Sequence, residues 1–170
     1  MKLSEALNHI LESVNISPKN EYVETINGKG RILAEDLKSP FDIPPFDNSQ
    51  VDGYAVNTSL LKFNEPMQIS QRIPAGVSSN TLIPNTVARI FTGAKLPEGA
   101  NAVVMQEDVL LENGKVIFKK EVVPLQYIRS RGCDLKNNEI FFKAGRFLSE
   151  ADIGMCSSIG MDKIKVFKKN

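Results

Sequence analysis

Apolar residues near the start of the chain follow a helical period. They recur every three or four positions, at Leu3, Ala6, Leu7, Ile10, Leu11 and Val14. This spacing places them along one face of an amphipathic helix. The pattern therefore predicts a helix over residues 3–14, closed off by Pro18.

The next segment, residues 22–37, fits two structures. Asn27-Gly28 is typical of a tight hairpin turn, whereas residues 31–36 are compatible with a short helix, and the sequence leaves both open. Prolines then recur through residues 39–46. Because proline fixes φ and favours an extended residue before it, this stretch is predicted to be a rigid linker and a domain boundary.

Between about residues 47 and 127 no helical period survives. Short apolar runs lie between glycine and proline breakers, which predicts strands near residues 68–73, 87–92, 102–106 and 109–118. The last of these contains Asn113-Gly114, the dipeptide preferred in a two-residue type I′ hairpin turn. We therefore expect an all-β domain of barrel or sandwich type.

The pattern changes again after residue 127. Ser149 and Asp152 are spaced as a capping box that opens a helix, and Gly160 is placed to end it. Lys163 to Phe167 alternates as a strand does. A chain that ends on a strand and a short basic tail is expected to be a piece of a larger protein.

Composition narrows the classes of function. Of 170 residues, 42% are apolar and 24% charged, and 21 basic against 20 acidic residues leave a net charge of +1. This balance gives no field that attracts nucleic acid or an acidic membrane, and no apolar run reaches the ~18 residues of a membrane span. A single histidine, His9, argues against a histidine-rich metal site. Two cysteines outside any CxxC pair, Cys133 and Cys156, indicate a reducing, cytoplasmic location.

Polar residues crowd three segments where strands should hold apolar ones. In the first, Asp52 precedes Gly53 and serves either as a turn former or as a ligand-binding carboxylate. In the second, the Thr92 hydroxyl and the Gly93 amide can hold an oxyanion in a backbone nest. The alternative for the second segment is a tight loop that needs glycine for its positive φ.

The third segment, Arg129–Asp134, carries two arginines two positions apart. On an extended backbone Arg129 and Arg131 share a face and can bind an oxyanion bidentately. The alternative is a solvated charge cluster. Cys133 lies in this segment with no base beside it, so we expect it to be incidental, and Cys156 is expected to be a core thiol.

Together the three segments resemble the MoeA family, whose animal counterpart is the E domain of gephyrin. The likeness runs in order along the chain and rests on Phe46–Ser49, Asp52–Val56, Arg89–Ala94, Pro97–Ala100, Ala102–Glu107, Ile128–Arg129, Arg131-Gly132 and Asp134. One departure is Cys133, which stands where the family often has a glutamate. This departure weakens the expectation of paired carboxylates at the third motif.

The resemblance implies an α+β, mostly β fold with two domains. An elongated, discontinuous α/β dimerisation domain would comprise residues 1–45 plus 128–170, and an inserted all-β, barrel-like domain would comprise residues 46–127. The family's nucleotide- and pterin-binding domain and its C-terminal domain have no match in this chain. The resemblance also implies a homodimer.

The function implied by the resemblance is molybdenum-cofactor biosynthesis. Family members transfer molybdate into adenylylated molybdopterin with Mg²⁺ and release AMP. Catalytic roles would fall on Asp52, Thr92 and Asp134, and the two carboxylates would also hold the metal. The anion-binding positions would be Ser49, Gly93, Arg129 and Arg131. This chain would then supply the domain I and II wall of a cleft between subunits and be inactive by itself.

Two other classes of function are considered beside the enzyme. A non-catalytic dimerising scaffold would share the fold without the chemistry. A carbohydrate- or oligonucleotide-binding β barrel is disfavoured, because only 7% of the residues are aromatic, tryptophan is absent and the net charge is near zero.

Overall fold

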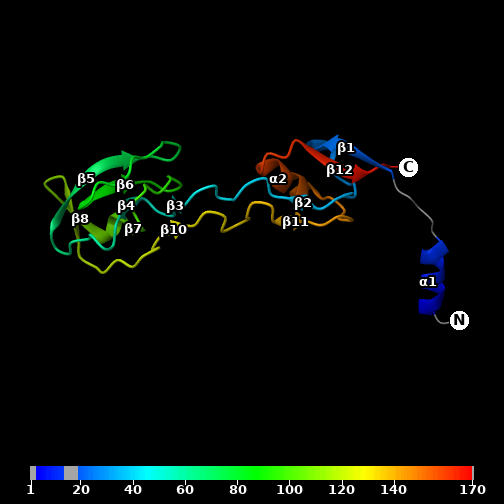
Figure 1. The fold of residues 1–170 in the computed structure, drawn as a ribbon, viewed down its shortest axis with the longest axis horizontal. Helices are drawn as coiled ribbons and strands as arrows, with labels where there is room; N and C mark the ends of the chain where they lie inside the picture. The colour runs from blue at the N-terminus through cyan, green and yellow to red at the C-terminus, as the bar shows by residue number, and fades with distance from the viewer. Residues whose placement is uncertain (1–2, 14–18, 170) are drawn as a thin grey trace. The chain divides into compact units, whose positions relative to one another are not determined.

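A computed structural model describes residues 3–13 and 19–169 (Figure 1). The chain divides into two compact units. Unit 1 comprises Met1–Ser39 with Ile140–Asn170, and unit 2 comprises Pro40–Glu139. Unit 2 is therefore inserted into unit 1 along the sequence.

Unit 2 is built on a six-stranded sheet that curls into half a barrel (Figure 1). The strand order is β7-β4-β6-β5-β9-β8, and every neighbouring pair is antiparallel except β5 with β6. The bounds are β4 (Gly53–Val56), β5 (Pro66–Ile73), β6 (Thr86–Ile90), β7 (Ala102–Met105), β8 (Val109–Glu112) and β9 (Lys115–Phe118). One turn of 3-10 helix, η2 (Gln106–Asp108), follows β7. The mostly-β prediction for residues 47–127 is confirmed.

The strand β4, which lies between β7 and β6 in this sheet, is buried on both faces. Along β4, Tyr54 and Val56 pack in one apolar cluster, whereas Ala55 between them packs in another. Successive strand residues point to opposite faces, so a strand covered on both sides reads as a continuous apolar run. The run Gly53–Val56 is buried at all four positions for this reason.

The hairpin between β8 and β9 forms at the predicted turn. Glu112 pairs with Lys115, which leaves Asn113 and Gly114 as the two loop residues. Their φ angles are +50° and +75°, as a type I′ turn requires. The prediction from Asn113-Gly114 is confirmed.

Two extended segments of unit 2, one before and one after the six-stranded sheet in the sequence, pair with each other. The strand β3 (Asn48–Ser49) is antiparallel to β10 (Ile128–Arg129), and Ile43 bridges to Leu135. The Gly132 amide donates to the Pro44 carbonyl at 2.9 Å. These contacts group residues 40–45 and 128–139 with unit 2, although the sequence analysis assigned them to the discontinuous domain.

The core of unit 1 is built from two small sheets and the second of its two described α-helices. Its strands β1 (Asn20–Glu24) and β12 (Lys163–Phe167) pair antiparallel, as do β2 (Leu37–Lys38) and β11 (Ile140–Phe142). The helix α2 (Glu150–Ser158) completes a core that includes Leu33, Leu148, Ile153, Cys156, Ile164 and Val166. The predictions of a C-terminal strand and of a buried Cys156 thiol are confirmed.

The ends of α2 follow the sequence prediction. The Ser149 hydroxyl accepts from the Asp152 amide at 3.3 Å, and the Asp152 carboxylate accepts from the Ser149 amide at 3.0 Å. These reciprocal bonds are a capping box, which satisfies amides that would otherwise lack partners at a helix start. Gly160 follows the helix with φ +72°.

Neither structure considered for residues 22–37 forms. The chain continues from β1 into one 3-10 turn, η1 (Thr25–Asn27), and Gly28 has φ −80°, which excludes the predicted hairpin turn. In place of a helix, Leu33 bridges to Val166 of β12 and its amide donates to the Arg146 carbonyl at 2.9 Å. Pairing with a strand distant in sequence therefore decides the backbone here.

The N-terminal helix α1 (Leu3–Ser13) carries the predicted apolar stripe, but none of its residues is buried. Leu3, Leu7, Ile10 and Leu11 are each more than half exposed. The predicted positions Val14 and Pro18 lie outside the described residues. In the parts of the chain that the structure describes, no helix combines the length and apolarity needed to cross a membrane.

Candidate functional site

Asp52 and Thr92 form a clasp between two strands of unit 2. Asp52 lies just before β4 and Thr92 just after β6, and Asp52 Oδ1 accepts from both the Thr92 amide and the Thr92 hydroxyl, each at 2.8 Å. These donors, the amide first, hold the pKa of the Asp52 carboxyl below its ordinary value. Within the described chain, Asp52 Oδ2 has no hydrogen-bond donor. Of the two alternatives for Asp52, a turn closed by its own side chain does not form, because its hydrogen-bond partner lies 40 positions along the chain.

Gly53 fixes the position of Asp52 against the neighbouring strand. A Cβ at this residue would lie 2.0 Å from the Val104 carbonyl oxygen of β7. The Asp52 carbonyl also accepts from the Gln106 amide at 3.1 Å. The glycine thus allows the protein's own backbone, rather than a ligand, to approach closely.

An open hollow of about 540 Å³ lies beside this clasp. It is lined by Asn48, Ser49, Gln50, Thr92, Gly93, Arg129 and Cys133, and we call it the Arg129 hollow. It brings together four of the predicted site residues, namely Ser49, Thr92, Gly93 and Arg129. The predicted carboxylates adjoin it, since Asp52 contacts Thr92 and Asp134 contacts Arg129.

Three predicted anion donors of this hollow are already bound to protein acceptors. The Ser49 hydroxyl donates to the Val51 carbonyl at 2.6 Å, and the Gly93 amide donates to the Ser49 carbonyl at 2.8 Å. The Thr92 hydroxyl donates to Asp52. Because each donor already has a protein acceptor, direct binding of an oxyanion by these groups stays a prediction that requires them to exchange partners.

Arg129 supplies the positive charge of the hollow. It forms an ion pair with Asp134, and both side chains are nearly half exposed. Cys133 first, and then Asp134, hold the pKa of the Arg129 guanidinium above its ordinary value. Exposed ion pairs are weak, so an anionic ligand can compete with Asp134 for this guanidinium.

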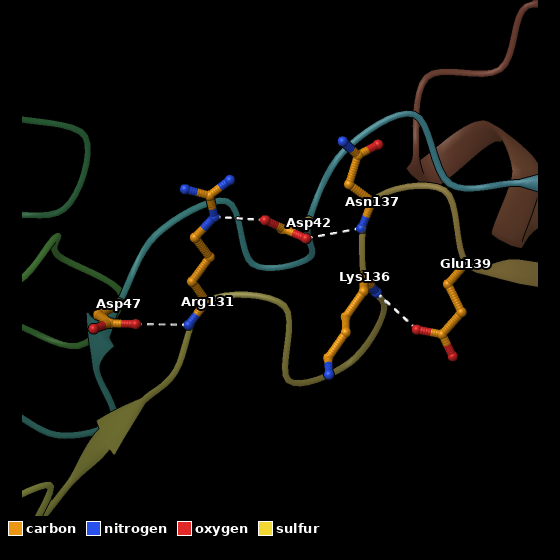
Figure 2. A network of polar contacts seen from close by, with 6 residues as sticks. All are labelled: Asp42, Asp47, Arg131, Lys136, Asn137 and Glu139. Carbon is orange, nitrogen blue, oxygen red and sulfur yellow. Dashed lines mark hydrogen bonds and ion pairs between the residues drawn. The ribbon is translucent and has the colours of Figure 1, made fainter.

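Arg131 has different partners from Arg129. Its Nε donates to Asp42 Oδ2 at 2.5 Å, and its amide donates to Asp47 Oδ1 at 2.7 Å (Figure 2). The strand β10 ends at Arg129, and the chain then turns through Gly132 with φ +67°. The two arginines are therefore held by different carboxylates, and their joint binding of one anion stays a prediction.

Asp42 is a functional candidate that sequence reasoning missed. Besides Arg131, its carboxylate accepts from the Asn137 amide at 2.8 Å (Figure 2). These donors, the Asn137 amide first, hold the pKa of the Asp42 carboxyl below its ordinary value. Asp42 thereby fastens the segment that carries Arg129 and Asp134 to the opposite extended segment. No local motif marks it, because its partners lie about 90 positions away.

The described residues contain no group of three histidine, cysteine, aspartate or glutamate side chains suited to a metal. Asp52 and Asp134, the predicted metal ligands, each contact a different partner. Mg²⁺ is commonly held by one or two carboxylates, with water and substrate oxygens completing the octahedron. The Asp52 Oδ2 atom fits that mode of binding, whereas an all-protein metal cage does not fit.

Comparison with known proteins agrees with this architecture. Residues 1–160 match the family described as MoeA N-terminal region (domain I and II). The molybdopterin molybdenumtransferase of Haemophilus influenzae is 34% identical over 171 positions, which cover 99% of this chain and 42% of that protein. The molybdopterin molybdenumtransferase of Nostoc sp. is 32% identical, and the match covers 91% of this chain and 38% of that protein.

Comparison with a solved structure points to the same family. The molybdopterin biosynthesis moeA protein from Pyrococcus horikoshii OT3 superposes with a TM-score of 0.87 at 35% identity, over 98% of this chain and 45% of that chain. The chain thus spans about two fifths of the length of the relatives it matches.

The fold and the hollow together define a class of protein. Its chain has two units, and the inserted half-barrel carries a carboxylate–threonine clasp beside an arginine–carboxylate pair. The comparisons identify the family within that class. This chain belongs to the MoeA family, of which it represents the N-terminal region.

Proposed function

We propose that this chain contributes to molybdenum-cofactor biosynthesis as the domain I and II part of a molybdenum insertase. The reaction transfers molybdate into adenylylated molybdopterin and releases AMP. The observation that carries the proposal is the Asp52–Thr92 clasp beside the Arg129–Asp134 pair, around one open hollow. Two relatives are molybdopterin molybdenumtransferases, which supports molybdopterin and a molybdenum compound as substrates.

The roles of the residues follow from the charge of the substrates. Molybdate and the phosphoryl groups are all anionic, so their approach must be offset by cations. Arg129 would release Asp134 and bind an oxyanion through its planar guanidinium. Asp52 would hold Mg²⁺ or its water ligands through Oδ2, while Thr92 keeps the carboxylate ionised and oriented. Mg²⁺ held there would offset the negative charge of the oxyanion and of the phosphoryl group.

These 170 residues are proposed to form one wall of a site and to be inactive alone. The Arg129 hollow is open and holds no residue that recognises a pterin or an adenine through a stacked aromatic side chain. The exposed apolar stripe of α1 supports a homodimer in which a second copy covers it. We place the protein in the cytoplasm because Cys133 and Cys156 are both unpaired.

The competing proposal is a dimerising scaffold without catalysis. The observation that favours it is Cys133, which stands where the family often has a glutamate and so leaves Asp134 as the one carboxylate at that motif. An enzyme and a scaffold differ in whether AMP is released.

The experiment combines the whole gene product with adenylylated molybdopterin, molybdate and Mg²⁺. We expect cofactor and AMP to form together, and Thr92→Val to lower both rates by about tenfold or more, because it removes one of two donors that hold Asp52. Ser70→Ala is the matched control, since it removes a hydroxyl from the same sheet at β5, outside the clasp. Absence of AMP release from the parent protein would favour the scaffold.

A further inference from the structure

A second pair of arginines lies at the end of the sheet in unit 2. Arg72 of β5 and Arg89 of β6 are direct partners in the parallel pairing of these strands. Each guanidinium carbon lies 4.5 Å from the centre of the same ring, that of Phe91. Phe91 immediately precedes Thr92, so this pair adjoins the Asp52–Thr92 clasp.

The two guanidinium groups differ in how they are held. Arg89 is half-buried and anchored, because it donates to the Gly53 carbonyl at 2.9 Å and to the Gln106 side chain. Arg72 is exposed, and among the described residues it has neither a hydrogen-bond acceptor nor an ion pair. The Arg89 guanidinium is therefore held by protein acceptors, whereas that of Arg72 has none among the described residues, and both contact the same Phe91 ring.

Protein carboxylates do not neutralise this pair. The Thr92 amide and hydroxyl, and after them the charge of Arg89, lower the pKa of the Asp52 carboxyl, yet no ion pair joins Asp52, or any other described carboxylate, to either arginine. Glu107 is one step removed, since it accepts from Gln106 at 3.0 Å. Like charges on adjacent strands repel, and the cation–π contacts with Phe91, and of Arg89 with Tyr54 as well, offset only part of that cost.

An oxyanion would relieve the repulsion. A guanidinium presents parallel N–H donors that match two oxygens of a tetrahedral anion, and Arg72 has all of its donors available. We propose that Arg72 and Arg89 bind a tetrahedral oxyanion, either molybdate or a terminal phosphoryl group, at a position separate from Arg129. The identity of the anion rests on the proposed function, whereas its binding does not.

The test titrates this 170-residue chain with molybdate, inorganic phosphate and AMP in separate experiments, and follows the Nε–H signals of the arginines by NMR. We expect saturable shifts of the Arg72 and Arg89 signals. Arg72→Gln should weaken binding about tenfold, since it removes a charge-assisted bidentate contact. Lys119→Gln is the matched control, because it removes one exposed positive charge from the same unit and should leave affinity unchanged.

Comparison of the three affinities identifies the ligand: tightest binding of molybdate indicates molybdate, and tightest binding of phosphate or AMP indicates a phosphoryl group. Equal affinity of Arg72→Gln and the parent chain would overturn the proposal. So would loss of binding in Arg129→Gln alone, which would assign the anion to the Arg129 hollow. Either result leaves the assay of AMP release by the whole gene product standing, so the two failures are distinguishable.

Discussion

Replacing Gly53 with alanine is expected to break the contact between β4 and β7. The added carbon would lie 2.0 Å from the Val104 carbonyl oxygen and 2.9 Å from its carbon, whereas ordinary contacts begin at 3.4 Å. The two strands must therefore separate by more than about 1 Å, which strains the packing and weakens their hydrogen bonds. Overpacking of about 1–3 kcal/mol and lost hydrogen bonds of about 1 kcal/mol each give a loss of about 3 kcal/mol or more.

Thermal unfolding followed by circular dichroism measures this loss. A destabilisation of this size should lower the Tm of unit 2 by about 10 °C or more. Gly154→Ala is the control, because Gly154 lies inside α2 with no atom within 4 Å of its added Cβ and should gain about 0.5–1 kcal/mol. A Gly53→Ala protein that melts within about 1 °C of the parent would refute the close approach of β7.

Three further perturbations test other parts of the structure. Arg146, followed by the Ser149 amide, lowers the pKa of Asp152 from 3.8 to about 2, so its stabilisation is present above about pH 4 and is lost as the pH falls through about 2. Urea titrations at pH 5 and pH 2 should show the parent losing about 2 kcal/mol more than Asp152→Asn; equal losses would contradict this ion pair. Gly114→Val should cost about 1 kcal/mol or more in the same assay, and an unchanged midpoint would exclude the positive φ. Iodoacetamide should modify exposed Cys133 and spare Cys156, because burial raises the pKa of the Cys156 thiol to about 11; mass spectrometry that finds both labelled would contradict the core position.

Features set by neighbouring residues could be predicted from the sequence. Asn113-Gly114 specifies its turn because both residues tolerate positive φ, and Ser149 with Asp152 specifies a helix start because each caps the other's amide. The strand Lys163–Phe167 follows from alternation alone. In each case the physical cause lies within a few positions of the chain.

Features set by distant partners could not be predicted. Leu33 lies in a segment with helical character but pairs with β12, and that pairing overrides local propensity. The contacts of Asp42 could not be predicted for the same reason, because its partners lie far along the chain. Nor could the different ion-pair partners of Arg129 and Arg131. Four of the predicted site residues line the Arg129 hollow, whereas the hydrogen-bond partners within it required the fold.

The proposed role of Asp52 in molybdate insertion is tested most directly by Asp52→Asn in the whole gene product. Asparagine keeps the side-chain volume and can still accept from Thr92, but it loses the charge that would hold Mg²⁺. Asp108→Asn is the matched control, since Asp108 is a carboxylate of the same unit that pairs with Lys120 away from the clasp. The measurement is cofactor formed per unit time, with circular dichroism recorded on each protein. We predict a fall of about 100-fold or more for Asp52→Asn with an unchanged spectrum, and parental activity for Asp108→Asn. Near-parental activity of Asp52→Asn would contradict a catalytic role and leave Asp52 as a residue that only joins two strands.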